Sequence, residues 1–161
     1  MRPELRLPPQ APAGKAARPL VLDTNIVLDL LLFADPAVAA VRTLLQVRRL
    51  DWVATGPMRD ELERVLQYAH LQPRMAHYGV TAEGLLAAFD TGSRVVDVAM
   101  RAPYVCKDAD DQKFIDLAVA QRAILLSKDK AVLCMHKRLL SLDVQAVAAL
   151  VFEESVVACS A

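Results

Sequence analysis

The sequence predicts an α/β domain built around a mainly parallel sheet. Short runs of aliphatic and β-branched residues alternate with longer segments in which apolar residues recur at helical spacing. With 161 residues, the chain fits one domain and is long enough to bury a hydrophobic core. Its composition, 55% hydrophobic and 24% charged, is typical of a globular chain and excludes an intrinsically disordered one.

Five short segments are expected to form the strands. Each is aliphatic or β-branched and is followed by polar residues, as strands of such a sheet usually are. They are "LVLD" at 20–23, "DWVATG" at 51–56, "SRVVDVA" at 93–99, "AILLSKD" at 123–129 and, more weakly, "LDVQAV" at 142–147. We expect the first of them near the centre of the sheet.

Five longer segments carry the periodicity of amphipathic helices. They span 25–49 with a break at Pro36, 57–70, 81–91, 110–121 and 129–140. Two of these helices lie between the second and third predicted strands. The alternation therefore predicts helices on the faces of the sheet.

The N-terminal segment differs in composition from the rest of the chain. Five of the nine prolines fall within its first nineteen residues. We therefore divide the chain into a proline-rich arm at 1–18 and a folded domain at 19–161. The arm is expected to be flexible, or extended against a neighbouring subunit.

Charge and cysteine content limit the classes of function. The formal net charge is zero, with 19 basic and 19 acidic residues, so a phosphate-containing partner would need a local basic patch or a metal ion. Cys106, Cys134 and Cys159 form no CxxC pair, which argues against a zinc site or disulfide framework and favours a reducing cytoplasm. Neither a secretory signal nor a membrane-spanning run is recognisable, and no membrane association is expected.

Acidic residues occur at three of the expected strand-to-helix junctions. Asp23 ends "VLDTN", Asp111 opens the helix "DQKFIDLA", and Asp129 follows "LLSKD". In parallel sheets, ligands bind beyond the carboxyl ends of the strands, so these side chains are expected to converge. Taken singly, Asp23 and Asp129 could also be helix caps, and Thr24 and Asn25 are good capping residues as well.

A fourth acid is selected by helix geometry. At about 100° per residue, Glu61 lies about 80° from the centre of the predicted buried stripe, which contains Met58, Leu62, Val65, Leu66 and Ala69. Asp60 and Glu63 point further away and are expected on the surface. Glu61 therefore flanks the core and faces the edge of the sheet.

The segment "CKDADDQKF" crowds three aspartates, Asp108, Asp110 and Asp111, into four positions. Packed carboxylates raise one another's pKa unless a cation neutralises them. No lysine or arginine stands out as a permanent counterion, so we expect Mg²⁺ or Mn²⁺, which prefer hard oxygen ligands. Asp110 is expected as a helix cap or supporting ligand, Asp108 in the loop, and Asp116 on the surface or behind the site.

Such a metal site is suited to phosphoryl chemistry. Two ions can activate a water and stabilise the leaving 3′ oxygen of an in-line displacement. Six nearby basic residues are candidates for holding a substrate backbone, although each is also explained as a solvated charge. They are Arg59, Arg64, Lys107, Lys113, Lys128 and Lys130.

Four motifs taken together resemble the PIN-domain ribonucleases, in particular the branch of toxin components of bacterial type II toxin–antitoxin systems. They are "VLDTNIVLDLLL", "TGPMRDELERVL", "CKDADDQKFIDLAVA" and "AILLSKDKAVL", and the resemblance covers about residues 19 to 150. It implies a three-layer α/β/α, PIN-like (Rossmann-like) domain around a mainly parallel five-stranded sheet. It also implies metal-dependent cleavage of RNA, an antitoxin partner and a homodimer.

The resemblance also assigns roles to individual residues. The catalytic, metal-binding acids would be Asp23, Glu61, Asp111 and Asp129, with Asn25 and Ser127 supporting them by hydrogen bonds. The last motif has Ser127 where many relatives have threonine, which keeps the hydroxyl group. The proline-rich arm lies outside the family pattern.

Two other interpretations of the sequence remain open. A phosphohydrolase with an aspartate nucleophile usually carries a second acid two positions later, where this chain has Asn25, and it would leave Glu61 and Asp129 without a role. A catalytically silent PIN-like module could instead bind RNA or a protein. Sequence alone does not establish turnover.

Overall fold

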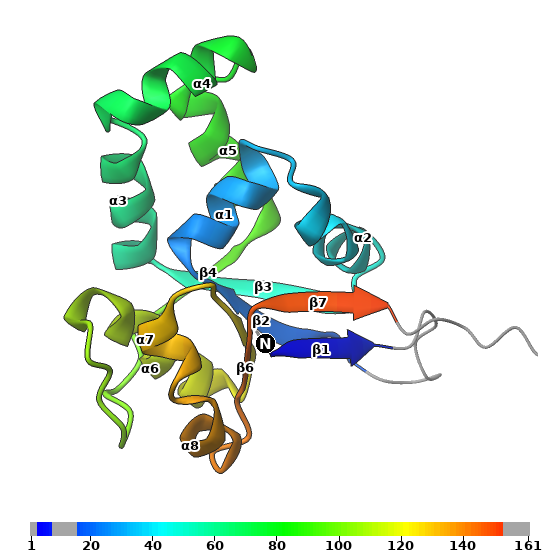
Figure 1. Cartoon of the computed structure of the whole chain (residues 1–161), viewed down its shortest axis with the longest axis vertical. Coiled ribbons are helices and arrows are strands. Elements are labelled where there is room, and N and C mark those ends of the chain that lie inside the picture. Colours follow the sequence, from blue (N-terminus) through cyan, green and yellow to red (C-terminus); the bar gives the residue numbers. More distant parts are fainter. Residues whose placement is uncertain (1–2, 8–15, 153–161) are drawn as a thin grey trace, which may run out of the picture.

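The computed structural model describes residues 3–7 and 16–152, whose centre is a five-stranded parallel sheet (Figure 1). The strand order is β4-β3-β2-β5-β6, and every pairing between neighbours is parallel. The bounds are β2 Arg18–Leu22, β3 Leu50–Thr55, β4 Arg94–Val96, β5 Ile124–Leu126 and β6 Gln145–Val147. The five predicted strands and the central position of the first are confirmed.

Helices cover both faces of this sheet, so the domain has three layers (Figure 1). One layer contains α1 Thr24–Leu31, α2 Ala39–Gln46, α3 Gly56–Val65, α4 Gln72–His77 and α5 Ala82–Gly92. The other contains α6 Gln112–Gln121, α7 Lys130–Leu133 and α8 His136–Leu140. Short 3₁₀ turns are η1 Pro36–Val38, η2 Ala69–Leu71 and η3 Ala109–Asp111. The predicted α/β/α architecture is confirmed.

Two predicted helices are wrong in extent. The helix expected at 57–70 ends at Val65, and Ala69, expected in its buried stripe, is exposed in η2. The chain turns there because Gln72 Nε2 donates to the carbonyl oxygens of Leu66 and Tyr68, which a continued helix would have occupied. The short helix α4 follows, so the described chain has three α-helices between β3 and β4 where two were expected.

The helix expected at 129–140 is divided into α7 and α8. The carbonyl oxygen of Leu133, in the last turn of α7, lies 2.8 Å from His136 Nδ1. Met135, at the junction, is buried in the core. The backbone therefore bends between the two helices to bring this side chain inside.

Part of the proline-rich arm forms a strand. β1, Glu4–Leu7, pairs in parallel with β7, Ala149–Phe152, and makes a second, two-stranded sheet. Leu7 and Leu150 are buried in this pair. The described part of the arm thus lies against its own domain. Residues 8–15 lie outside the described residues. The boundary between arm and domain at residue 18 stays a prediction.

The core surrounds the central strands. Leu20 and Val21 on β2, and Ile124 and Leu125 on β5, are fully buried. Trp52 and Phe89 are both buried, and their rings meet edge to face at 5.1 Å, which joins β3 to α5. This packing fixes the carboxyl ends of β2, β3 and β5, where the acidic residues lie.

No single helix in the described part of the chain is long and apolar enough to cross a membrane. Helix α1 and the segment Pro36–Gln46 together have the length and composition of a membrane span, but the two are bent by 103° relative to each other.

Candidate functional site

Asp23 and Ser127 meet at the carboxyl edge of the sheet because β2 and β5 are neighbours in register. Leu22 is paired with Leu126, so the residues that follow these strands lie side by side. Ser127, fully buried, donates its hydroxyl to Asp23 Oδ2 at 2.7 Å and accepts the backbone N–H of Asp129 at 3.1 Å. Ser127 therefore orients both an acid and the loop that carries the next one.

Asp23 also caps α1, which is the alternative role expected for it. Its Oδ1 accepts the backbone N–H of Asn25, whose side chain is exposed, at 3.4 Å. Thr24 and Asn25, expected as caps, are instead the first residues of the helix. Among the described contacts, Asn25 reaches the acids through its backbone N–H.

Glu61, in the second turn of α3, faces the same edge. Its Oε2 accepts the Thr24 hydroxyl at 3.0 Å and lies 2.9 Å from Lys113 Nζ. Both side chains of this ion pair are largely buried, with 17% exposed for Glu61 and 25% for Lys113. The expectation that no basic residue stands within the acidic pattern is therefore wrong, and Thr24 is a contact that the sequence reading missed.

Three further carboxylates gather around the start of α6 and α7. Asp108, Asp111 and Asp129 each offer an oxygen, and these oxygens all lie within 4.8 Å of one another, close enough to share a cation. Asp108, expected merely in the loop, thus belongs to the cluster and also caps η3 through the N–H of Asp110. Asp110 is exposed and does not cap η3; its backbone carbonyl oxygen accepts a hydrogen bond from Lys113 Nζ. Asp129 caps α7 by accepting the N–H of Ala131 at 2.9 Å.

The electrostatics of this cluster favour a bound cation. Burial, above all, raises the pKa of Asp111 to about 8; its hydrogen bond with Asp129 and the charges of Asp23, Asp129 and Asp108 act in the same direction. Its Oδ2 is buried and has no hydrogen-bond partner among the described residues. A buried, unpartnered carboxylate oxygen facing other acids is what a divalent cation with oxygen ligands would satisfy.

Asp23 responds to the same surroundings. Burial raises the pKa of this carboxyl group, the hydrogen bonds from Ser127 and from the Asn25 N–H lower it, and the charges of Asp129 and Glu61 raise it. The four predicted acids therefore act on one another electrostatically, although Glu61 and Asp23 lie outside the tightest group of three. A cation between these groups would relieve their mutual repulsion.

The loop before the cluster is held by Gln112, a buried residue that the sequence reading did not single out. Gln112 accepts the N–H of Cys106 at 2.6 Å and donates to the carbonyl oxygen of Tyr104 at 3.1 Å and to Asp116 at 2.8 Å. Asp116 also accepts the N–H of Ala102 at 2.8 Å, so it lies behind the site, one of its two expected places. Together they tie the segment that leads to Asp108 onto α6.

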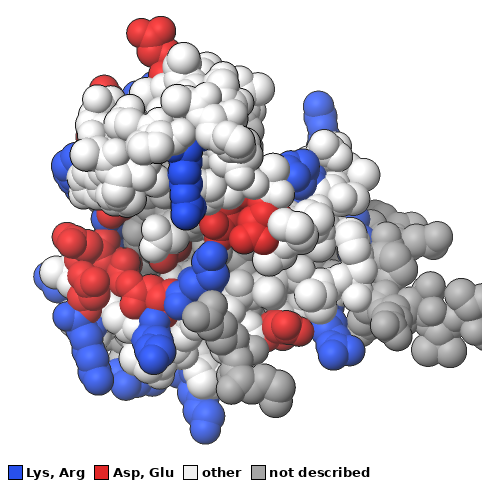
Figure 2. Space-filling view, turned by 45° about the horizontal axis from the view of Figure 1, so that its top comes forward, with Lys and Arg blue, Asp and Glu red and all other residues white. Residues whose placement is uncertain are grey.

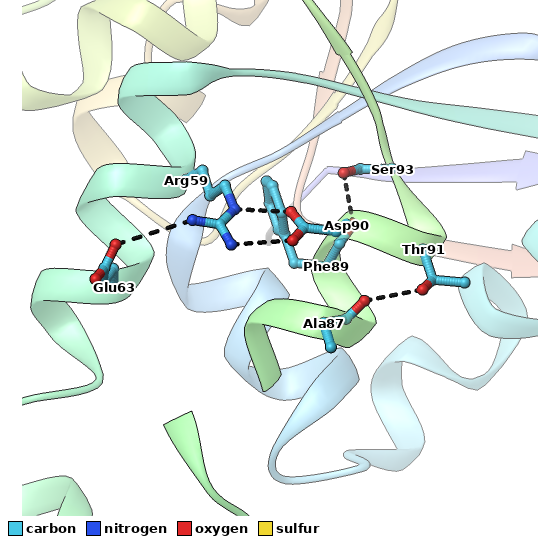
Figure 3. A network of polar contacts seen from close by, with 7 residues as sticks. All are labelled: Arg59, Glu63, Ala87, Phe89, Asp90, Thr91 and Ser93. Carbon is cyan, nitrogen blue, oxygen red and sulfur yellow. Dashed lines mark hydrogen bonds and ion pairs between the residues drawn. The ribbon is translucent and has the colours of Figure 1, made fainter. Parts of the chain in front are cut away.

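The basic residues expected to hold a substrate differ in their surroundings. Arg59 makes two hydrogen bonds to Asp90, at 2.7 and 2.9 Å, and lies 3.9 Å from Glu63, so it joins α3 to α5 (Figure 3). Lys128 forms an ion pair with Asp29. Three others are exposed: Arg64, Lys107 and Lys130. Figure 2 shows acidic side chains gathered along a hollow in this face, with basic ones beside them.

Comparisons with known proteins agree with this architecture. A solved structure, VapBC2 from Rickettsia felis bound to a DNA fragment from their promoter, has a similar fold, with a TM-score of 0.54. The likeness covers 83% of this chain and 98% of that chain at 12% sequence identity, so it concerns the fold alone. Comparison with curated protein sequences found no match. The family model described as the PIN domain matches residues 19–131, well over half of the chain, and the chain therefore belongs to the PIN domain family.

Proposed function

We propose that this protein is a metal-dependent endoribonuclease that hydrolyses RNA phosphodiester bonds. The observation that supports it most directly is the unpartnered, buried Oδ2 of Asp111 among the oxygens of Asp108 and Asp129. PIN domains are generally nucleases, and membership of the family points in the same direction. Four acids would hold Mg²⁺ or Mn²⁺, namely Asp23, Glu61, Asp111 and Asp129, with Asp108 as an additional ligand.

The chain's own residues would keep these ligands in place. Ser127 holds Asp23, and the N–H of Ala131 holds Asp129. The Thr24 hydroxyl holds Glu61. When bound, Mg²⁺ or Mn²⁺ would lower the pKa of a water and stabilise negative charge on the reacting phosphate. Since Asp23, Glu61 and Asp129 are already hydrogen bonded, little reorganisation of these three carboxylates would be needed during the reaction.

The proposed reaction is the attack of water on phosphorus with departure of the 3′ oxygen. Two exposed basic residues near the edge, Lys107 and Lys130, would contact the RNA backbone, and Arg64 lies on α3 near Glu61. Lys113 and Arg59 would act mainly on the protein, because each is engaged by a carboxylate. RNA binding would therefore depend on a few local charges in a chain without net charge.

The biological role that we propose is that of the toxin in a toxin–antitoxin pair. The structural similarity to a VapBC2 assembly supports this role through the fold. An antitoxin protein would block the acidic edge, and the active form would be a homodimer in the cytoplasm. Expression alone should arrest growth, whereas expression of Asp23→Asn should not; size-exclusion chromatography with light scattering would test the dimer.

The deciding experiment is incubation of the purified protein with labelled single-stranded RNA in Mg²⁺, in Mn²⁺ and in EDTA. We expect cleavage in either metal, none in EDTA, and a loss of at least about 100-fold in Asp23→Asn, as when a charge-stabilising group is removed from an active site. Asp60→Asn, which removes an exposed carboxylate from α3, is the matched control and should cleave normally. RNA binding without cleavage would instead identify a silent binding module, and turnover of small phosphoesters a phosphohydrolase.

A further inference from the structure

A second pocket lies beside the acidic edge, between the C-terminal part of α1 and α4. It is open to solvent and has a volume of about 610 Å³. Its walls carry aromatic, basic and acidic side chains and comprise Asp29, Phe33, Asp35, Pro73, Arg74, His77 and Tyr78. This mixture differs from that of the proposed metal site, which consists of carboxylates.

The aromatic side of the pocket is suited to a planar ligand. The Arg74 guanidinium lies 5.2 Å from the centre of the Phe33 ring and makes a cation–π contact. The rings of His77 and Tyr78 meet at 5.2 Å and 75°, and Tyr78 is 51% exposed. Proteins that bind single-stranded RNA stack unpaired bases on such rings and on arginine planes.

The acidic side of the pocket would select among bases. Ionised aspartates are hydrogen-bond acceptors only, so they favour a base edge that presents N–H donors. Asp35 uses Oδ1 to cap η1 through the N–H of Ala37, at 2.9 Å, which leaves its second oxygen for a ligand. Guanine presents two neighbouring N–H donors on its Watson–Crick edge.

The pocket is connected to the proposed active site. Asp29 lies on α1 six residues after Asp23, about 9 Å along the helix at 1.5 Å per residue. It forms an ion pair with Lys128, the neighbour of Asp129. A nucleotide adjoining the cleaved bond could therefore reach the pocket.

We propose that this pocket between α1 and α4 binds a guanine base of the single-stranded RNA substrate, next to the cleaved phosphodiester. The base stacks on Tyr78 and the Arg74–Phe33 pair, and its N–H groups donate to Asp35 and Asp29. This inference rests on the proposed ribonuclease function. It makes the pocket the source of base preference, whereas the acidic edge acts on the phosphate.

The test measures binding separately from cleavage. Guanosine 5′-monophosphate and its adenosine, cytidine and uridine counterparts are titrated into the full-length protein by calorimetry and ligand-observed NMR. We expect the guanosine nucleotide to bind most tightly, and Tyr78→Ala to weaken it about 5- to 100-fold, the effect of losing one stacking ring. Asp35→Asn, which can still cap η1, should lose the preference for guanine over adenine.

Tyr68→Ala removes an exposed tyrosine outside the pocket and is the control, expected to leave guanosine binding unchanged. Equal binding of all four nucleotides, or the same affinity in Tyr78→Ala and Tyr68→Ala, would overturn the guanine site. Cleavage of RNA by the wild-type protein, measured in parallel, decides the ribonuclease function by itself. If the protein cleaves RNA but guanosine binding does not respond to Tyr78→Ala, only the guanine site is overturned. If the protein binds guanosine nucleotide but does not cleave RNA, the ribonuclease function is overturned.

Discussion

Lys113 on α6 and Glu61 on α3 form an ion pair of 2.9 Å across the carboxyl edge of the sheet. The two helices belong to opposite layers, so this contact joins the layers at the proposed active site (Figure 1). The ammonium group of Lys113 already supplies one positive charge to the acids. It is therefore expected to stabilise the metal-free protein and to compete with a metal ion for Glu61.

Replacement of this lysine should separate the two effects. In Lys113→Gln, we expect a lower melting temperature without metal and tighter binding of Mn²⁺, because the competing charge has been removed. Calorimetry and electron paramagnetic resonance would measure the affinity. Lys137→Gln, an exposed lysine on α8, is the control. Weaker Mn²⁺ binding in Lys113→Gln would show that the lysine supports the metal site instead.

The raised pKa of Asp111 predicts a pH-dependent stability of the metal-free protein. Folding raises this pKa from 3.8 to about 8, so the folded state keeps a proton that the unfolded state has released. The stabilisation is complete below pH 4 and is lost as the pH rises to about 8. Asp111→Asn, which stays neutral, should lack this loss and melt higher than wild type at pH 8, by at least about 2–4 °C.

A bound metal ion should reverse the order of the melting temperatures of wild type and Asp111→Asn. At pH 8, Mg²⁺ would stabilise the wild type by taking the place of the proton, whereas Asp111→Asn should gain little. Thermal melts at several pH values, with and without Mg²⁺, measure both effects. Identical pH profiles for wild type and Asp111→Asn would contradict the assignment of the raised pKa to this residue.

The carboxyl edge could be predicted from sequence because it follows from local patterns. Asp23 and Asp129 each come directly after an aliphatic run, and parallel strands end at the same edge of a sheet. The direction of the Glu61 side chain could be predicted from the angle between Glu61 and the buried stripe of its helix. These arguments need only the period of a helix and the direction of a strand.

Contacts between distant elements could not be predicted in this way. The pairing of β1 with β7 joins the two ends of the described chain, and no short-range pattern in Glu4–Leu7 specifies that partner. The ion pair of Lys113 depends on how α3 and α6 approach each other over the edge. Asp108 lies at the end of a loop whose backbone Gln112 holds at Cys106 and Tyr104, and these contacts depend on tertiary packing.

Ser127 should be needed for both stability and activity. Ser127→Ala removes a hydroxyl that donates to Asp23 and accepts the N–H of Asp129 in a fully buried place. We expect a loss of about 1–3 kcal/mol in the free energy of unfolding, the cost of unsatisfied buried polar groups. Ribonuclease activity should fall by more than the loss of folded protein explains. Ser127→Thr keeps the hydroxyl and should retain most activity; loss of activity in both variants at equal stability would argue against a role for that group.

Gln112 should control the affinity for metal from outside the cluster. Gln112→Leu keeps a similar volume but removes the hydrogen bonds that tie the Cys106 and Tyr104 backbone to α6. The loop before Asp108 should then exchange its amide hydrogens faster, and Mn²⁺ affinity should fall about 10- to 100-fold, as when a partner of a ligand is lost. Hydrogen exchange with mass spectrometry locates the change. Unchanged exchange in this loop, together with normal Mn²⁺ affinity, would show that Asp108 is placed without Gln112.

Arg59 and Lys130 should differ in their effect on RNA. Lys130 is exposed at the start of α7, directly after Asp129, whereas Arg59 is engaged by Asp90 and Glu63. Lys130→Met should weaken RNA binding and reduce the slope of log affinity against log salt by about 0.7, the loss of one phosphate contact on a single strand. Arg59→Met should leave the slope unchanged and lower the melting temperature, because it releases α5 from α3. Titrations of a fluorescent single-stranded RNA at several salt concentrations, on the Asp23→Asn background, measure the slope. Equal slopes for both variants and the parent would mean that Lys130 contacts no phosphate.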